Sequence, residues 1–342
     1  MWVKGEIIRD LDEADAVARG SLDRDTQQSL FDRISWFHRT WEHCHSGNKP
    51  LIVRARAEGS DAWLFLAEDD NRRATGLASW YTLAFRPITT GAHTESKFHA
   101  QLVAMARRLR PRLVRITLDH VPADDADRIC RGFRRAGWIT HVTPQTANWS
   151  IDVTGKTFAD YWAERPGQLR STARRKASKA PMELTILDRF DNAAWEDYAS
   201  VYADSWKPDE GSLSFVRAMA TDEGKAGTLR LGLARHEGRA IAAQLWTVEH
   251  GIAIIHKLAH RQDAAELSPG TILSRAMFER AIDHDKVTMI DFGTGDDRYK
   301  TDWTDTRVMR MRVDLYNPYT ARGLWSAAKA SIRALVAARP NG

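Results

Sequence analysis

The stretch from Leu229 to Trp303 constrains the fold more than any other part of the chain. Its apolar runs and turns predict three strands, a helix, a further strand and a polar loop, in that order. The tetrapeptide Ser268-Pro269-Gly270-Thr271 stands where the helix begins, because serine is a preferred N-cap and proline suits the first helical position. The first turn of a helix has N–H groups without helical partners, and glycine allows a ligand to approach closely. This helix start therefore suits a phosphate or pyrophosphate.

Composition indicates a globular chain with room for two domains, since 342 residues are 43% hydrophobic and 28% charged. The net charge of +5 favours anionic partners, but 50 basic against 45 acidic residues fit a phosphorylated cofactor as well as nucleic acid. The two distant cysteines, Cys44 and Cys130, predict no disulfide framework and indicate a reducing compartment. Without an apolar leader or membrane-length apolar run, we expect a cytoplasmic protein. Nothing in the sequence indicates the oligomeric state.

The first half of the chain repeats the order of elements seen in the second, although the two halves share negligible sequence identity. Alternating apolar residues predict strands, and apolar residues at helical spacing predict helices. The strands are expected at 51–56, 62–68, 75–83, 113–118, 138–142 and 147–153, and the helices at 29–43, 95–109 and 124–136. We therefore predict an α/β (α+β) fold of two domains, each with a sheet flanked by helices.

Six positive charges and no acidic residue lie between Arg165 and Lys179. Such a cluster destabilises an isolated helix unless anions or acidic side chains face it. Three interpretations stay open: a solvated connector helix, a surface for a phosphorylated cofactor or acidic substrate, and a nucleic-acid contact. The tail from Arg322 to Arg339 predicts a basic amphipathic helix, for which packing on its own domain is favoured over a membrane-surface or partner-binding role.

Several motifs of the second half together resemble those of a known family. They are the basic segment at 165–179, GRAIAAQL at 238–245, KLAH at 257–260, LSPG at 267–270, and IDFG at 290–293 followed by GDDRYK at 295–300 and Trp303. This set resembles the GNAT-type acyltransferases once labelled cellulose-biosynthesis acetyltransferases. These are similar in turn to the Fem ligases, which are peptidoglycan aminoacyltransferases. The resemblance in motifs covers about 160–316 and is only architectural before that.

The resemblance implies tandem GNAT domains. The first, degenerate domain would span 1–155, a basic connector helix 156–181, the acyltransferase domain 182–320 and a C-terminal amphipathic helix 321–342. In the family, acyl-CoA lies where one strand splays from its neighbour, and here that strand would be Ile252–His260. The pyrophosphate would contact Ser268, Pro269, Gly270 and Thr271, and Lys257 is a further cofactor-binding candidate. LSPG departs from the usual pyrophosphate motif, a glutamine or arginine followed by spaced glycines.

Acyl transfer from a thioester needs a deprotonated nucleophile, a polarised carbonyl and a protonated leaving thiolate. Neither cysteine lies near the motifs, which favours direct transfer over a covalent enzyme intermediate. Asp296 is the first candidate for the base or substrate orienter, with a turn residue as its alternative. Asp291 is the second candidate, and His256 is either a groove residue or a satisfied core histidine. Tyr299 is the candidate acid, with packing as the alternative.

Three further residues are candidates for substrate binding. Gln244 could bond the acceptor or the pantetheine amides, Lys300 could hold an acidic group, and Trp303 closes the motif region. Histidines and Cys44 crowd the helix end near residue 45, but no second ligand cluster follows in the sequence, so we expect no metal.

The combined prediction is an acyltransferase that moves an acyl group, expected to be acetyl, from coenzyme A to an amine or sugar-type acceptor. The acceptor could be a small molecule or a glycan or peptidoglycan precursor. One alternative keeps the fold and takes the acyl group from charged tRNA, as Fem ligases do; nucleic acid is expected in that case alone. A second alternative is a non-catalytic anion-binding protein with a GNAT core, for which salt-sensitive nucleic-acid binding without coenzyme A binding would be diagnostic.

Overall fold

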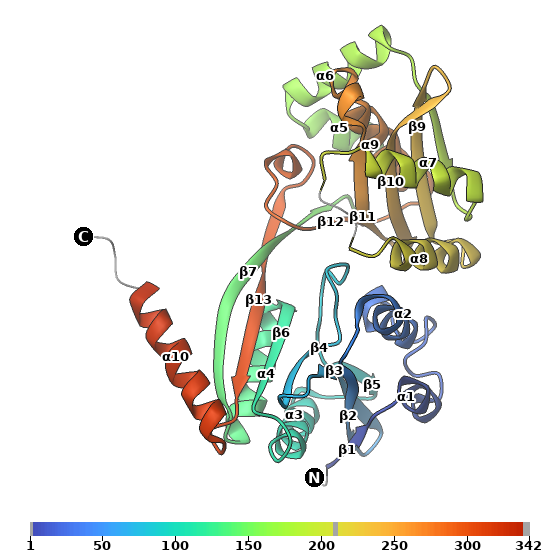
Figure 1. Cartoon of the computed structure of the whole chain (residues 1–342). Helices are drawn as coiled ribbons and strands as arrows, with labels where there is room; N and C mark the ends of the chain where they lie inside the picture. Colours follow the sequence, from blue (N-terminus) through green and yellow to red (C-terminus); the bar gives the residue numbers. More distant parts are fainter. Residues whose placement is uncertain (1–2, 208–210, 338–342) are drawn as a thin grey trace. The chain divides into compact units, whose positions relative to one another are not determined.

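The computed structural model describes residues 3–207 and 211–337, with side-chain environments described up to residue 332. The chain forms two compact units (Figure 1). Unit 1 combines the residues up to Thr146 with those from Met309 onward, and unit 2 is the continuous segment Ala147–Val308. The chain therefore leaves unit 1 within strand β7 (Ile139–Asp152) and returns to it within β13 (Thr306–Tyr316).

Unit 1 contains a sheet flanked by helices. Its strand order is β1 (Lys4–Ile8), β2 (Lys49–Ala57), β3 (Ser60–Glu68), β4 (Arg73–Gly76), β6 (Arg115–Pro122) and β13, with β5 (Ile88–Gly91) paired to β3. Only the β4–β6 pair is parallel among the described strand pairs of this unit. Its helices are α1 (Leu11–Ala18), α2 (Ile34–Cys44), α3 (Glu95–Leu109), α4 (Ala123–Arg135) and α10 (Ala321–Ala337), with a 3₁₀ turn at Leu30–Asp32.

The last strand of unit 1 comes from the far end of the chain. β13 pairs antiparallel with β6, from Arg310 opposite Pro122 to Tyr316 opposite Arg115. Arg115 also donates a 2.6 Å hydrogen bond to Asp314 across this pair. Val313 and Leu315 of β13 are fully buried in the apolar core of the unit. The core of unit 1 is therefore completed by residues that follow unit 2 in the sequence.

Unit 2 contains the remaining strands. Its strand order is the end of β7, then β12 (Met289–Thr294), β11 (Ile252–His260), β10 (Arg239–Glu249), β9 (Leu229–His236) and β8 (Glu183–Leu187). β11 and β12 are parallel and the other pairs antiparallel. The helices are α5 (Phe158–Glu164), α6 (Gly167–Lys179), α7 (Asn192–Ala203), α8 (Leu213–Lys225) and α9 (Pro269–Glu279), with 3₁₀ turns at Gln262–Leu267 and Arg298–Asp302 and a π turn at Arg280–His284.

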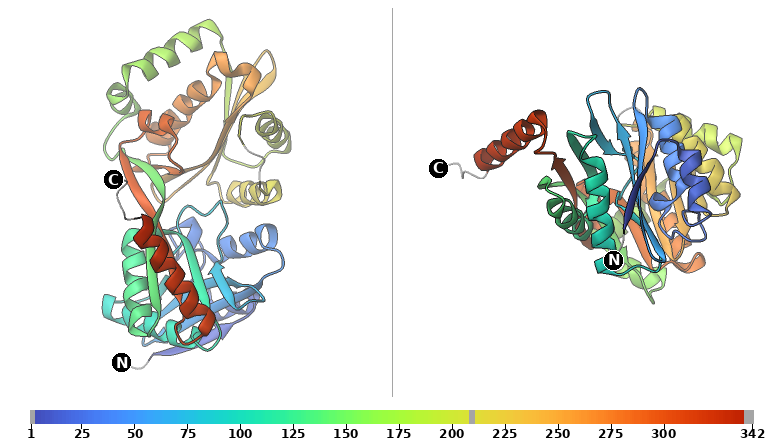
Figure 2. Two further views of the ribbon diagram at one scale, coloured as in Figure 1. Left: turned by 60° about the vertical axis from the view of Figure 1, so that its left-hand side comes forward. Right: turned by 90° about the horizontal axis from the view of Figure 1, so that it is seen from below.

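Helices α9 and α7 cover opposite faces of the unit 2 sheet (Figure 2). On β9, a side chain at Gly232 would meet Met277 of α9, whereas Arg235 forms a salt bridge with Asp197 of α7. Residues three apart on a strand point to opposite faces, so these two contacts place the helices on different sides. The glycine at position 232 allows α9 to lie close to the strand.

The predicted fold class is confirmed: the structure has mixed, mostly antiparallel sheets flanked by helices. Several details differ from expectation; the predicted helix at 29–43, for example, is a 3₁₀ turn at Leu30–Asp32 followed by α2 from Ile34. β7 is one long strand where two were predicted, β4 is shorter than the predicted strand, and the basic connector consists of two helices, α5 and α6, separated at Pro166. The contact-based units divide the chain at 146 and 308, and the domain ranges inferred from the resemblance stay a prediction. Among the described residues, no helix has the length and apolar character needed to cross a membrane.

Candidate functional site

Strands β11 and β12 separate partway along their length. They are paired at Ile252–Met289, Ala253–Ile290 and Ile254–Asp291. Beyond these pairs β11 continues to His260 beside β10, while β12 continues to Thr294 beside β7. The sheet therefore opens between the carboxyl ends of two parallel strands. In sheets of this kind, ligands bind at the carboxyl ends of the strands, where neighbouring connections diverge.

Helix α9 begins at the predicted place near this opening. Pro269 is its first residue and Ser268 occupies the N-cap position. The Ser268 side chain makes no capping hydrogen bond, contrary to expectation, because this residue has a left-handed backbone with φ 54° and ψ 44°. Its carbonyl accepts instead from the N–H groups of Thr271 and Ile272, at 3.1 and 3.2 Å, and its own N–H donates to Ala265. Within the tetrapeptide, the Gly270 N–H is thus the donor left for a ligand.

Gly270 faces the end of β11. A Cβ atom added to this glycine would lie 3.4 Å from the Nδ1 atom of His260. Burial lowers the pKa of His260, and the positive charge of Lys207 lowers it further. His260 is therefore a neutral imidazole near neutral pH. Gly270 therefore has an uncharged, polar neighbour at the helix start.

A β-bulge at His256 alters the inner part of β11. Leu245 of β10 lies opposite Lys257, whereas the next residue, Trp246, lies opposite Ile255, so His256 is the extra residue. Its Nε2 atom lies 2.9 Å from Oγ1 of Thr247. Bulges redirect side chains and occur often beside active sites. This bulge gives His256 a defined polar partner in the middle of the strand.

Lys257 is buried on the α7 side of the sheet. Its ammonium lies 5.5 Å from the centre of the Tyr202 ring, and the side chain is 9% exposed. Gly270 belongs to α9, which covers the other face. The structure therefore does not bring Lys257 to the helix start, where the resemblance implies a cofactor contact.

Gln244 connects β10 to α9. Its amide nitrogen donates to Ser274 Oγ at 2.7 Å and to the Gly270 carbonyl at 3.4 Å, while its oxygen accepts from the Trp246 indole at 2.9 Å. The side chain is 1% exposed. The side-chain NH₂ and carbonyl groups of Gln244 are therefore both hydrogen-bonded to the protein. Gln244 thus fixes the position of the helix start instead of facing an open site.

Asp291 stabilises the end of β12. One carboxylate oxygen accepts hydrogen bonds from the Gly293 N–H at 2.8 Å and from Asn148 Nδ2 at 2.9 Å. The register against β7 shifts at this place, with Phe292 as the extra residue. Asp291 therefore holds a second bulge on the strand that forms one side of the opening.

Asp296 lies in the polar loop after β12 and forms an ion pair with Arg307. The Arg307 guanidinium donates from Nε at 3.2 Å and from Nη2 at 2.8 Å. This hydrogen bonding holds the pKa of Asp296 below its usual value. An efficient general base has a pKa near the working pH. The pair favours an orienting role for this exposed carboxylate over proton abstraction.

Tyr299 packs edge-on against Phe292, with ring centres 5.8 Å apart. Burial raises the pKa of Tyr299, and the negative charge of Asp297 raises it further. The phenol therefore keeps its proton at neutral pH and can act as a hydrogen-bond or proton donor.

Lys300 and Trp303 hold the polar loop in place. The Lys300 ammonium donates to the carbonyls of Thr294 at 2.6 Å and Gly293 at 3.4 Å, and burial lowers its pKa. Trp303 packs against Phe278, with ring centres 5.0 Å apart, and is 4% exposed. Both were expected to contact substrate, but the structure gives them structural contacts in the interior.

Three site residues do not appear among the sequence candidates: Asn148, Thr247 and Arg307. Thr247 could have been found from the tight turn between β10 and β11, because a hairpin turn sets the cross-strand register. The sequence near Asn148 does not indicate its role, because its partner Asp291 is 143 residues away. Arg307 is 11 residues from its partner Asp296, and no motif connects the two. Among the described residues there is no cluster of three or more histidine, cysteine or acidic side chains that could hold a metal.

Residues 163–301 match the acetyltransferase (GNAT) domain family. No curated protein matches the sequence of the chain. The chain is similar in structure to the C-terminal domain of a putative lysylphosphatidylglycerol synthetase from Agrobacterium fabrum, with 12% identity, a TM-score of 0.58, and 94% of this chain and 96% of that chain covered.

Two further solved structures are similar along most of the chain. FemX has 11% identity and a TM-score of 0.59, with 91% of this chain and 98% of that chain covered. A tandem GNAT protein from the clavulanic acid biosynthesis pathway has 9% identity and a TM-score of 0.51, with the same coverage of 91% and 98%. The fold is that of tandem GNAT proteins. The predicted tandem GNAT-like architecture is thereby confirmed at the level of fold.

Proposed function

We propose that this chain is an acyl-CoA-dependent N- or O-acyltransferase that transfers an acetyl group directly to an amine or sugar-type acceptor. The observation that carries the proposal is the opening between β11 and β12 beside the start of α9. An extended, amide-containing pantetheine arm can add to exposed strand backbone, as peptides add to a sheet edge. Its pyrophosphate would then bind at the Gly270 N–H and the positive end of the α9 dipole.

The side chains around the opening can serve direct acyl transfer. Tyr299 would protonate the leaving thiolate as the C–S bond breaks. Asp296 would orient the acceptor, and His256 would take the proton that the attacking amine or hydroxyl loses. We include Asp291 as a positioning residue for β12. No covalent bond to the protein is needed in this scheme.

The setting of the reaction is part of the proposal. The likeness to FemX and to a putative lysylphosphatidylglycerol synthetase supports an acceptor related to peptidoglycan precursors or lipids. Neither Cys44 nor Cys130 forms a disulfide. Free cysteines support a reducing compartment, and hence a cytoplasmic reaction.

A second candidate function differs in the donor: an aminoacyl group from charged tRNA. The exposed basic side chains of α6 favour it, because arginine and lysine on one helix can contact a phosphate backbone. A non-catalytic anion-binding role is the third candidate. It is supported by the ion pair with Arg307, because this pair makes Asp296 less available as a catalytic base.

Calorimetric titration with acetyl-CoA tests the main proposal, using the wild type, Gly270→Glu and Gly270→Ala. The nearest atom outside the helix to an added Cβ is His260 Nδ1 at 3.4 Å, so both variants should fold. We expect saturable binding to the wild type and to Gly270→Ala. The glutamate adds bulk and negative charge at the pyrophosphate, so we expect affinity to fall by at least about tenfold.

Unchanged affinity in a folded Gly270→Glu variant would exclude the helix start as the pyrophosphate site. Absence of binding by the folded wild type would contradict acyl-CoA as donor. Titration with charged tRNA would then separate the second candidate function from the third.

A further inference from the structure

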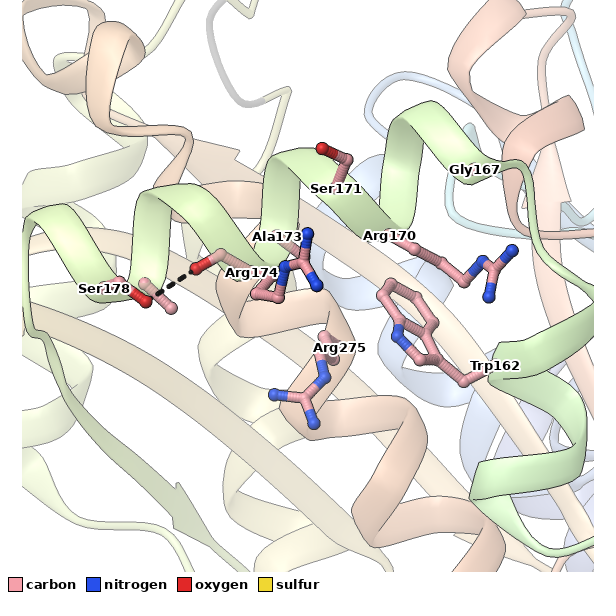
Figure 3. Close-up of a pocket in the computed structure, with 9 residues that line it drawn as sticks. Trp162, Gly167, Arg170, Ser171, Ala173, Arg174, Ser178 and Arg275 are labelled. Carbon is pink, nitrogen blue, oxygen red and sulfur yellow. Dashed lines mark hydrogen bonds between the residues drawn. The ribbon is translucent and has the colours of Figure 1, made fainter.

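A basic groove lies between α6 and α9 on the surface of unit 2 (Figure 3). Its cavity has a volume of about 560 Å³. The side chains that give it chemical character are those of Trp162, Arg170, Ser171, Arg174, Ser178 and Arg275. Three guanidinium groups thus share one concave surface with two hydroxyl groups and an indole, and no acidic residue lines it.

Arg170 and Arg174 of this groove differ from the buried arginines of unit 2, whose charge is compensated by a carboxylate. Arg165 and Arg261 are bound to the carboxylates of Asp305 and Asp204. Among the described residues, no carboxylate lies within ion-pair distance of Arg170 or Arg174, and the Glu279 carboxylate is 3.9 Å from Arg275. Positive groups held together in this way repel one another unless an anion compensates them.

The groove is built on fixed elements. Leu169 and Ala173 of α6 are buried, and α6 packs against α9. The Lys176 ammonium hydrogen-bonds the Glu266 carbonyl just before α9. Arg275 lies over the rings of Phe158 and Trp162, at 5.7 and 5.9 Å from their centres. The two sides of the groove therefore keep their spacing without a ligand, which lowers the entropic cost of binding one.

We propose that this groove binds the phosphate or diphosphate group of a small-molecule ligand. Guanidinium groups match phosphate oxygens with two parallel hydrogen bonds, and arginine is weakly hydrated enough to be used in this way. The Ser171 hydroxyl supplies a further donor, whereas the Ser178 hydroxyl donates to the Arg174 carbonyl within α6. A groove of this volume lies in the size range of small-molecule sites. The groove is distinct from the Gly270 N–H, since Arg275 lies five residues, or about 7.5 Å, further along α9.

Calorimetric titration with inorganic pyrophosphate at about 0.15 M salt, where exposed charges more than about 8 Å apart are largely screened, tests this site without coenzyme A. The variants are Arg174→Gln and Arg275→Gln, which each remove one groove charge, and Arg175→Gln as the matched control. Arg175 is exposed on the same helix but does not line the groove. We expect each groove variant to weaken pyrophosphate binding about tenfold. This is the effect expected when a ligand loses its hydrogen bonds to one charged group. Arg175→Gln should change it less than about twofold.

Two results would overturn the proposal. One is the absence of saturable pyrophosphate binding by the folded wild type. The other is an equal loss in Arg174→Gln, Arg275→Gln and Arg175→Gln, which would show diffuse attraction by a basic helix in place of a site. Loss of pyrophosphate binding in Gly270→Glu with no effect of the arginine variants would place the anion at the start of α9, and would also overturn it.

The phosphate could belong to coenzyme A itself or to a separate phosphorylated ligand. Titrations of Arg174→Gln with coenzyme A and with dephospho-coenzyme A, which lacks the 3′-phosphate, distinguish these sources. If Arg174→Gln weakens the binding of coenzyme A but not of dephospho-coenzyme A, the groove binds the 3′-phosphate. Unchanged binding of both, with pyrophosphate binding lost, would assign it to a separate phosphorylated ligand. The outcome of the pyrophosphate titration does not depend on the proposed acyl transfer, because the titration contains no acyl-CoA.

Discussion

The guanidinium of Arg307 donates two hydrogen bonds to the carboxylate of Asp296, at 3.2 Å from Nε and 2.8 Å from Nη2. This ion pair fixes the exposed carboxylate of the loop that follows β12. It also keeps that carboxylate charged at neutral pH, since the hydrogen bonds lower the pKa of Asp296. A charged carboxylate with a fixed direction is suited to orient an amine or hydroxyl acceptor.

Asp296→Asn should reduce turnover while leaving the affinity for acetyl-CoA largely unchanged. The amide keeps the shape of the side chain but loses the negative charge that would orient the acceptor. We expect the rate at saturating acetyl-CoA to fall by about 100-fold, the lower range for loss of such a group. Steady-state kinetics beside a calorimetric titration measure both effects. Wild-type turnover in this variant would remove Asp296 from the mechanism.

Arg307→Gln should raise the pKa of Asp296 toward its ordinary value of 3.8. The reason is that the guanidinium stabilises the charged carboxylate, and its removal makes protonation easier. Carbon-detected NMR of the labelled side chain, titrated from pH 3 to 6 in both proteins, would measure the change. An identical titration curve in the two proteins would contradict the ion pair.

Tyr299→Phe should slow acyl transfer by about 100-fold if the phenol protonates the leaving thiolate. The substitution keeps the ring that packs against Phe292, so the loop should remain in place. Tyr161→Phe is the matched control, because Tyr161 is also buried but donates its hydrogen bond to the Trp303 carbonyl. The control should lose stability and keep its turnover per folded molecule. A fully active Tyr299→Phe variant would leave this tyrosine a packing residue.

Lys300→Met should change how stability depends on pH. Burial lowers the pKa of Lys300 below 10.5 in the folded state, so the unfolded chain binds more protons between the folded pKa and 10.5. The free energy of unfolding of the wild type therefore gains from this residue as pH rises through that window. Melting temperatures from pH 7 to 9.5 should rise for the wild type relative to Lys300→Met. A constant difference across this range would show that burial does not shift this lysine.

Gln244→Leu should destabilise the protein by about 1–3 kcal/mol for each buried polar partner left without a hydrogen bond. The partners affected are the Trp246 indole N–H and the Ser274 hydroxyl. Ser274→Ala, which removes only one acceptor of the Gln244 amide, should cost less. Urea unfolding of the two variants measures the difference in the free energy of unfolding. Equal stability of Gln244→Leu and the wild type would show that this network does not hold α9 to β10.

Elements that depend on neighbouring residues in the sequence could be predicted. Helix α3 begins and ends at the predicted Glu95 and Leu109, and its start is capped by Thr94. β11 has the predicted ends Ile252 and His260, because glycine-containing turns precede it and its apolar residues alternate. The start of α9 followed from the preference of proline for the first helical turn. These features depend on neighbours within a few residues.

Features set by burial and backbone direction could not be predicted from the sequence. Lys300 follows a glycine-rich, acidic loop and has the composition of an exposed substrate contact, yet it bonds the carbonyls of Gly293 and Thr294 inside the protein. Ser268 is a preferred capping residue, but its left-handed backbone turns the side chain away from that role. The ion pair of Asp296 requires Arg307, which no short motif connects to the loop. Backbone direction and burial decide each case.

The pairing of β13 with β6 also sets an order of events during synthesis. Asp314 and its partner Arg115 are 199 residues apart, and all of unit 2 is translated between them. Unit 2 is continuous and can fold as soon as it leaves the ribosome, whereas β6 keeps an unpaired edge until β13 emerges. Contacts between such distant segments form slowly, and open strand edges promote aggregation. β6, made well before unit 2, would thus be among the last strands to reach its native pairing, and chaperones would be needed most in that interval.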